Sequence, residues 1–182
     1  HLVIRRQRQM CIRDRFLRSM NTQNSSLEFS HFPVMLSEII QIASPEKVGI
    51  FIDCTFGGGS YSNALLKFPK TKVIGIDRDE AVISRANELQ KKYQKRFKFY
   101  QIKFSELDKI LNKNADTIIF DLGLSSIQLK NLNRGFSFKS KNKLDMAMGL
   151  NNISAQEAIN NLSEKHLKLI IKILGEETEA SN

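Results

Sequence analysis

The sequence has only two cysteines and three prolines, no tryptophan and no long apolar run. Cys11 and Cys54 lack the closely spaced partners of a disulfide framework or a metal site, so we expect a reducing compartment, the cytoplasm, and no metal. No stretch approaches the roughly 18 apolar residues of a membrane helix, and we expect no membrane partner. The nine glycines follow no collagen-like period, and no internal repeat is visible.

The 182 residues suffice for one domain, and 41% hydrophobic with 26% charged residues is a globular composition. The net charge of +9 is uneven, because residues 1–20 hold six arginines and a single acid, whereas the rest is only mildly basic. The string RQRQMCIRDR resembles translated adapter sequence. We therefore expect residues 1–19 to be a non-native extension, with Met20 as the start.

Apolar runs alternate with segments of helical periodicity. Runs rich in β-branched and aromatic residues predict buried strands over 48–54, 72–77, 97–102 and 116–123. Helices are predicted over 35–44, 60–68, 79–94, 105–111, 154–162 and 164–174, the fifth with a capping box from Ser154 and Glu157. This alternation implies right-handed βαβ units and an α/β, Rossmann-like parallel sheet. We expect the sheet within residues 20–123, a long irregular loop over 124–150 and helices over 151–182.

Three predicted strands end at or near an acid, namely Asp53, Asp77 and Asp121. These carboxylates should share the carboxyl edge of the sheet, where open α/β sheets bind ligands. Asp77 is placed to accept two hydrogen bonds from ribose hydroxyls, and Asp79 to cap the next helix. The alternative is that both acids only cap and solubilise.

A glycine run, Gly57, Gly58 and Gly59, follows the first strand and leads into a helix. Glycines there let the backbone turn sharply and approach a ligand. The dinucleotide pattern G-x-G-x-x-G fails, because Ser62 occupies its third position, so a pyrophosphate ligand is disfavoured. Together with Asp77 the run indicates an adenosine-type ligand, and a tight turn without a ligand is the alternative.

The stretch DLGLSSIQL over 121–129 should face the reacting end of such a ligand. Asp121, Ser125 and Ser126 are therefore the candidate catalytic residues. No histidine or cysteine stands nearby as a nucleophile, and no spacing suits a metal. A reaction that needs mainly positioning, such as methyl transfer from a sulfonium, fits this set.

The segment 131–146 interleaves basic and aromatic residues. Basic side chains meet phosphates and aromatic rings stack on unpaired bases, so the segment is a candidate nucleic-acid contact. The alternative is a solvated lysine-rich loop pinned by two phenylalanines. The residues concerned are Arg134, Phe136, Phe138, Lys139, Lys141 and Lys143.

Several motifs together resemble the bacterial 16S ribosomal RNA (cytosine-N4)-methyltransferase family: HFPVMLSEII, DCTFGGGSYS, IDRDEAVISRA, FSEL, DLGLSSIQL, RGFSF, LDMAMG and GEE. This resemblance covers roughly residues 31–177. It implies a Rossmann-like fold with an inserted helical domain, S-adenosylmethionine as cofactor, and a cytosine of the small ribosomal subunit as substrate. Carried over by motif, the cofactor residues are Gly59, Ser60, Tyr61, Asp77, Phe104, Asp121 and Gln128. As RNA-contacting residues we expect Arg134, Phe136, Phe138 and Asp145.

The sequence departs from the family pattern in three places. Ser60 and Tyr61 stand where the family usually has Gly-His, and Lys143 and Ala147 replace a proline and an arginine around the LDM motif. The late SFHSLEDR-type motif is absent, so we expect a truncated chain with an unpaired sheet edge and marginal stability. Two other functions stay open, a non-catalytic fragment that binds RNA or nothing, and a nicotinamide-dependent oxidoreductase.

Overall fold

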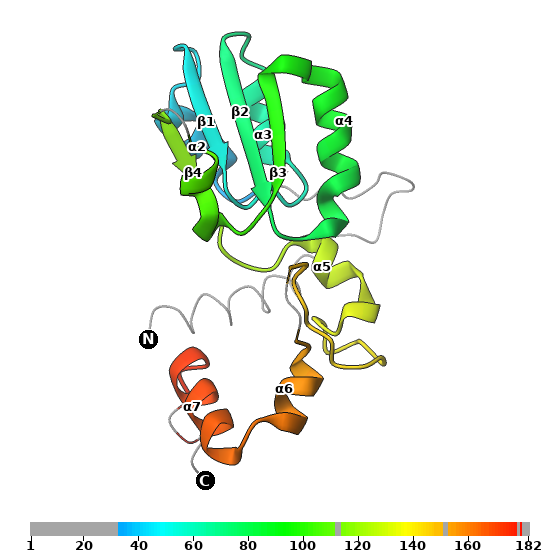
Figure 1. Ribbon diagram of the computed structural model, residues 1–182. Helices are drawn as coiled ribbons and strands as arrows, with labels where there is room; N and C mark the ends of the chain where they lie inside the picture. The colour runs from blue at the N-terminus through cyan, green and yellow to red at the C-terminus, as the bar shows by residue number, and fades with distance from the viewer. Residues whose placement is uncertain (1–32, 112–113, 151–152, 178, 180–182) are drawn as a thin grey trace, which may run out of the picture. The chain divides into compact units, whose positions relative to one another are not determined.

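The computed structural model describes residues 33–111, 114–150, 153–177 and 179 (Figure 1). The described residues divide into two compact units, one within 33–160 and one that holds 161–177. The extension expected over 1–19 lies outside the described residues. Within the described ranges, no helix is long and apolar enough to cross a membrane.

The larger unit contains a four-stranded sheet in the order β3-β2-β1-β4, with every neighbouring pair parallel (Figure 1). This order confirms the predicted Rossmann-like α/β sheet. The order reverses between β1 and β4, and the carboxyl ends beside such a reversal are where open sheets bind ligands. The strands are β1 (Gly49–Asp53), β2 (Thr71–Asp77), β3 (Phe97–Gln101) and β4 (Thr117–Ile119).

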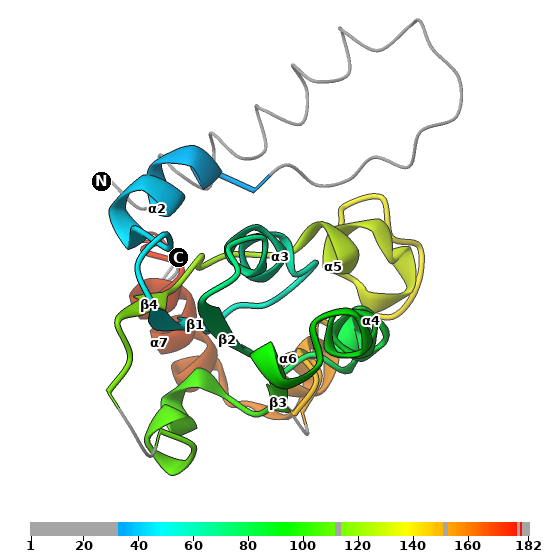
Figure 2. The same ribbon diagram turned by 90° about the horizontal axis from the view of Figure 1, so that it is seen from above.

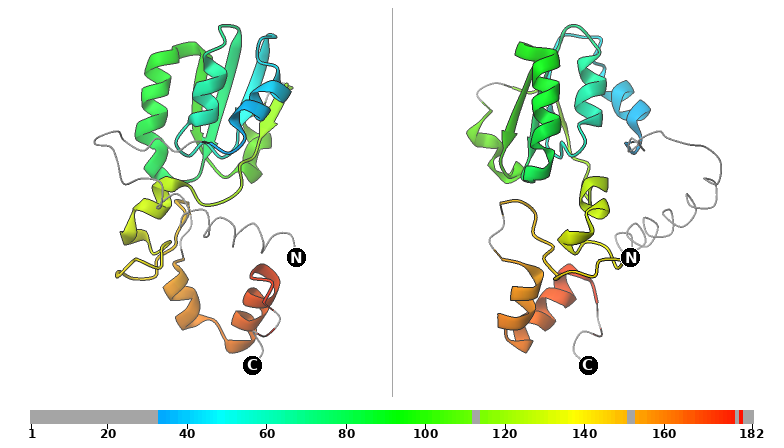
Figure 3. Two further views of the ribbon diagram at one scale, coloured as in Figure 1. Left: turned by 180° about the vertical axis from the view of Figure 1, so that it is seen from behind. Right: turned by 90° about the vertical axis from the view of Figure 1, so that its right-hand side faces the viewer.

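Three helices cover one face of the sheet, as Figures 2 and 3 show: α2 (Leu36–Ala43), α3 (Ser60–Leu66) and α4 (Ile83–Tyr93). Successive strand side chains point to opposite faces, so Phe51 of β1 packs under these helices while Ile52 faces the other side. The main core lies on the helical face, where Leu65 and Leu66 of α3 are fully buried.

The opposite face is covered by the segment that follows β3. Here Ile52, Cys54 and Ile76 pack against Leu107 and Ile110 in and after the 3-10 helix η3 (Phe104–Lys109). β1 is therefore buried on both sides, which explains its nearly continuous apolar sequence.

Most elements of the larger unit begin and end within a few residues of the predicted positions. The helix predicted over 79–94 is α4 flanked by two 3-10 turns, η1 (Glu80–Val82) and η2 (Gln94–Arg96), and that predicted over 105–111 is the 3-10 helix η3. The predicted end of the fourth strand is wrong, because β4 stops at Ile119. Beyond it, the backbone N–H of Asp121 donates to Thr55 Oγ1 at 2.8 Å instead of continuing a strand ladder.

The segment 124–150 is not wholly irregular, and that prediction is wrong for its first part. It contains α5 (Ser126–Lys130) and η4 (Leu132–Arg134). The predicted capping box before α6 (Ala155–Asn161) is confirmed, since Glu157 N–H donates to Ser154 Oγ and Ser154 N–H to Glu157 Oε2. In the smaller unit, α7 (Glu164–Leu174) follows an N-cap at Ser163.

We expect Leu65→Ala to lower the free energy of unfolding by about 2–5 kcal/mol, because it leaves a cavity in the main core. Urea unfolding followed by circular dichroism measures this change. Ile42→Ala is the matched control, because Ile42 is 82% exposed and its loss should cost about 0.5 kcal/mol or less. Equal effects of the two substitutions would contradict the described packing of α3.

Candidate functional site

The carboxyl edge of the sheet collects the loops that follow β1, β2 and β4. The glycine run lies directly after β1, and Phe56 N–H at its start donates to the carbonyl of Ile76 in β2. Gly59 has a positive φ of 73°, and a Cβ there would lie 2.7 Å from the Phe56 ring. The loop thus packs against its own residue Phe56, and this packing requires glycine at position 59 whether or not a ligand binds.

Asp77 joins the glycine run to the turn after β2. Its Oδ2 accepts from Gly57 N–H at 2.8 Å and its Oδ1 from Asp79 N–H at 2.9 Å. Burial raises the pKa of this carboxyl above its ordinary value, although these backbone hydrogen bonds oppose the shift. The side chain is only half-buried, and a carboxylate accepts about four hydrogen bonds. Asp77 therefore retains capacity for a hydroxyl pair.

Asp53 is fully buried at the end of β1. Ser62 Oγ donates to its Oδ2 at 2.7 Å, and Oδ1 has no hydrogen-bond partner among the described residues. Burial raises the pKa of Asp53 to about 6. Ser62, which breaks the dinucleotide pattern, is itself buried and has this structural role.

Tyr61 connects the glycine loop to Asp121. Its hydroxyl donates to the Val34 carbonyl at 2.5 Å and lies 3.3 Å from Asp121 Oδ2. Burial, followed by the charge of Asp121, raises the pKa of Tyr61 above its ordinary value, so the phenol stays protonated. Asp121 is exposed and also held through its backbone N–H by Thr55. Its carboxylate is therefore anchored and open to solvent.

Phe104, the first residue of η3, is 45% exposed. Its ring meets that of Phe120 edge-on, with centroids 5.6 Å apart, and Phe120 is 49% exposed. Two half-exposed aromatic rings after β3 and β4 provide an apolar surface beside the carboxyl edge. The motif resemblance pointed to Phe104, whereas Phe120 was missed because it was assigned to the interior of a strand.

The candidate catalytic serines lie at the start of α5. Ser125 is the N-cap, accepting from Gln128 N–H at 3.2 Å, while Gln128 Oε1 accepts from Ser125 N–H. Ser126 is the first helical residue. Gln128 is buried, and its Nε2 donates to Asp79 Oδ2 at 2.9 Å. Its amide therefore connects α5 to the turn after β2.

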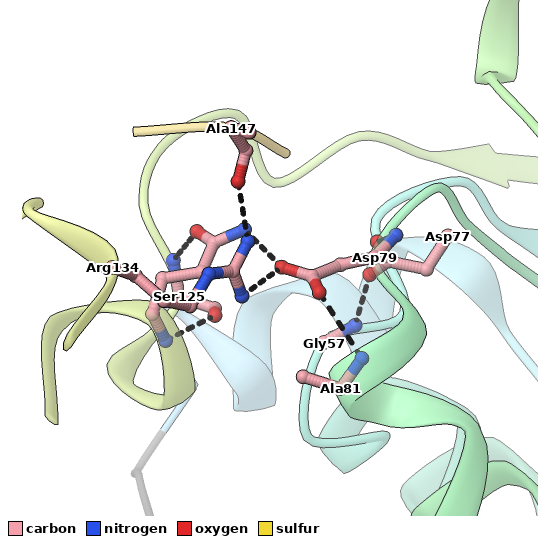
Figure 4. Close-up of polar contacts among 8 residues, drawn as sticks. Gly57, Asp77, Asp79, Ala81, Ser125, Arg134 and Ala147 are labelled. Carbon is pink, nitrogen blue, oxygen red and sulfur yellow. Dashed lines mark hydrogen bonds and ion pairs between the residues drawn. The ribbon is translucent and has the colours of Figure 1, made fainter. Parts of the chain in front are cut away.

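Asp79 does more than the predicted capping (Figure 4). Its Oδ1 accepts from Ala81 N–H at 3.1 Å, which confirms the cap, and its Oδ2 accepts from Arg134 Nη1 at 2.6 Å as well as from Gln128. Burial opposes ionisation of Asp79, but the hydrogen bonds from Gln128 and Arg134 outweigh it and lower the carboxyl pKa. Arg134 Nη2 also donates to the Ala147 carbonyl at 2.7 Å.

The candidate RNA-contacting residues divide into an inward and an outward group. Arg134 is held inside the segment, with its guanidinium 5.2 Å from the centroid of the half-buried Phe136 ring. Asp145 is half-buried, and its backbone carbonyl accepts from Ala155 N–H. Phe138 is fully exposed, and Lys139, Lys141 and Lys143 are exposed around it. No group of three metal-ligating side chains occurs in the part of the chain that the structure describes.

Comparison with known proteins gives one consistent result. Residues 28–182 match the model of the MraW methylase family. A protein of Rickettsia massiliae named ribosomal RNA small subunit methyltransferase H is 43% identical over 150 residues, 82% of this chain and 49% of its own length. The protein of that name from Orientia tsutsugamushi is 42% identical over 153 residues, 83% of this chain and 49% of its own. The chain spans about half the length of the curated relatives it matches.

The buried Asp53 predicts an unusual pH dependence of stability. Its folded-state pKa of about 6 exceeds the ordinary 3.8, so its contribution is complete below about pH 4 and is lost as pH rises through 6. Relative to Asp53→Asn, the wild type should lose about 2–2.5 kcal/mol of unfolding free energy between pH 4 and 8. Urea unfolding across that range measures it. Parallel curves for the two proteins would contradict the described burial, and the exposed Glu46→Gln is the charge-matched control.

Proposed function

The chain belongs to the MraW methylase family, and on that premise we propose that it binds S-adenosylmethionine and methylates the N4 amino group of a cytosine in 16S ribosomal RNA. Asp77 supports this proposal most directly, because it ties the glycine loop to β2 and keeps acceptor capacity at the carboxyl edge. The names of the relatives favour the RNA of the small ribosomal subunit as substrate. That substrate would be met in the cytoplasm.

The residues at this edge fit an adenosine-type cofactor. Asp77 would accept from the ribose hydroxyls, and Phe104 with Phe120 would contact the adenine. The unpartnered Oδ1 of Asp53 is a further acceptor in the same region, next to the glycine run. Gly59, Ser60, Tyr61 and Gln128 complete the proposed cofactor set by resemblance.

The chemistry needs positioned acceptors more than a strong base. The bound cofactor supplies an electrophilic methyl group on a sulfonium. The cytosine amine is a poor nucleophile because its lone pair is delocalised into the ring, so acceptors for its N–H groups favour the reaction. Asp121 is the best placed of the three candidates, because it is anchored and exposed, whereas the Ser125 hydroxyl already caps α5. The Ser126 hydroxyl is the third candidate.

The RNA would be met by the outward group of segment 124–150. Phe138 offers a fully exposed ring for stacking on an unpaired base, and Lys139, Lys141 and Lys143 offer charge to phosphates. Methylating a base in this way requires that it first leave its stack.

We expect S-adenosylhomocysteine to bind the chain saturably and Asp77→Ala to weaken this binding about 100-fold, because hydrogen bonds to a charged acceptor are lost. Isothermal titration calorimetry measures both affinities. Glu46→Gln, an exposed acid in the turn before β1, is the matched control and should bind as the wild type does. NAD should not compete. Unchanged binding by a folded Asp77→Ala protein, or binding of NAD with equal affinity, would refute the proposed cofactor.

A second prediction concerns the exposed ring of Phe138. We expect Phe138→Ala to weaken binding of a single-stranded oligoribonucleotide by about 1–3 kcal/mol, because one base loses its stacking partner. The melting temperature should stay unchanged, since the ring is 108% exposed. Fluorescence anisotropy measures the affinity. Ile42→Ala removes an exposed apolar side chain from α2 and should leave RNA affinity unchanged; an equal loss in both variants would point to non-specific contact.

A further inference from the structure

A continuous set of hydrogen bonds connects the proposed cofactor edge with the proposed RNA segment. It runs from Gly57 to Asp77, from Asp77 to Asp79, from Asp79 to Arg134, and from Arg134 to the Ala147 carbonyl (Figure 4). Every bond in it measures 2.6–2.9 Å. The two regions are therefore in direct polar contact through Arg134, a side chain that the basic-aromatic pattern alone assigns to RNA.

The Asp79–Arg134 ion pair is shielded from solvent. The two side chains are 3% and 15% exposed respectively. A buried pair differs from a surface pair in that removing one partner leaves an uncompensated charge in the interior. Asp79 also accepts hydrogen bonds from Gln128 Nε2 and the Ala81 N–H, so its carboxylate lies between η1, α5 and η4.

A second, independent contact holds the same segment in place. Gly149 has a φ of 54°, and a Cβ at this position would lie 1.8 Å from the Arg78 carbonyl oxygen. Only a glycine allows the backbone to lie this close to the turn after β2. In addition, Met146 N–H donates to the Arg134 carbonyl at 2.8 Å. Residues 131–149, which we name the docked segment, are thus fixed at Arg134 and again at Gly149.

We propose that Arg134 is a positioning residue rather than a phosphate ligand: with Asp79 it fixes the docked segment on the turn after β2, so that Phe138 and the lysines meet RNA beside the cofactor edge. This inference rests on the proposed function. Its guanidinium donates inward to Asp79 and Ala147 and lies over Phe136, which leaves it little freedom to reach a phosphate.

The two roles predict opposite effects of Asp79→Asn. If Arg134 met phosphate, removing a neighbouring negative charge would leave RNA binding unchanged or strengthen it. If Arg134 positions the segment, Asp79→Asn releases it and weakens RNA binding. The asparagine can still accept from Ala81 N–H, so the cap of η1 is kept while the charge that holds Arg134 is lost.

The experiment measures the affinity of a fluorescent single-stranded oligoribonucleotide over a range of salt concentrations. We expect Asp79→Asn, Arg134→Met and the double variant each to bind about tenfold more weakly than the wild type, the double variant no worse than either single one. Arg134→Lys should recover part of the loss. The slope of log K against log salt should stay as in the wild type, whereas loss of a phosphate contact would reduce it by about 1.

One further variant separates docking from charge, and one further measurement separates docking from unfolding. Gly149→Ala removes no charge, and it should weaken RNA binding as Arg134→Met does. Hydrogen exchange should show faster exchange of the Met146 amide in these variants while the amides of β1 and β2 remain protected. Lys70→Met and Glu46→Gln, both exposed at the amino edge of the sheet, are the matched charge controls.

The outcomes discriminate between this inference and the proposed function. The positioning role alone would be overturned by two results together. Asp79→Asn would bind RNA at least as tightly as the wild type, and Arg134→Met would reduce the slope of log K against log salt by about 1. A wild-type chain that binds S-adenosylhomocysteine but no RNA would overturn the RNA substrate, and this inference with it.

Discussion

The carboxyl edge of the sheet depends on one constraint, namely that an ionised carboxylate taken out of water must be given hydrogen-bond donors. Parallel pairing of β1 and β2 brings Asp53, Asp77 and the turn to Asp79 to the same edge. Asp79 meets the constraint with donors from three separate elements. Only one of these donors, the Ala81 N–H, comes from the turn itself, so the packing of α5 and η4 against the turn after β2 supplies the other two.

Asp53 and Asp79 show how the same residue type acquires opposite properties at one edge of the sheet. Both are buried, but Asp79 accepts from a guanidinium and an amide, and its pKa is lowered. Burial of Asp53 outweighs its hydrogen bonds from the Ser62 hydroxyl and nearby backbone N–H groups, and raises its pKa to about 6. Asp79, with its three hydrogen-bond donors, has a structural role. Asp53 keeps a buried oxygen, Oδ1, without a hydrogen-bond partner among the described residues, and perturbed carboxyls of this kind cluster at functional sites.

Local signals were sufficient to predict the sheet and part of the site. The apolar runs that became β1 to β3 and the caps at Asp79 and Ser154 depend on residues close in sequence, and the structure confirms them. The end of β4 was missed because the donor of the bond that replaces the ladder, Asp121 N–H, has its acceptor 66 residues away in Thr55. The inward orientation of Arg134 was likewise invisible, since Asp79 is 55 residues distant.

The effect of each departure from the family pattern depends on whether the fold uses the side chain or the backbone at that position. At position 147 the sequence has alanine where the family pattern has arginine. The structure uses that position through its carbonyl, which accepts from Arg134 and which any residue provides. At position 61 the side chain itself is used, and tyrosine there still donates a hydrogen bond to Val34 beside Asp121. Both departures thus keep the contact that this fold requires, one because it is a backbone contact and the other because the phenol supplies the donor.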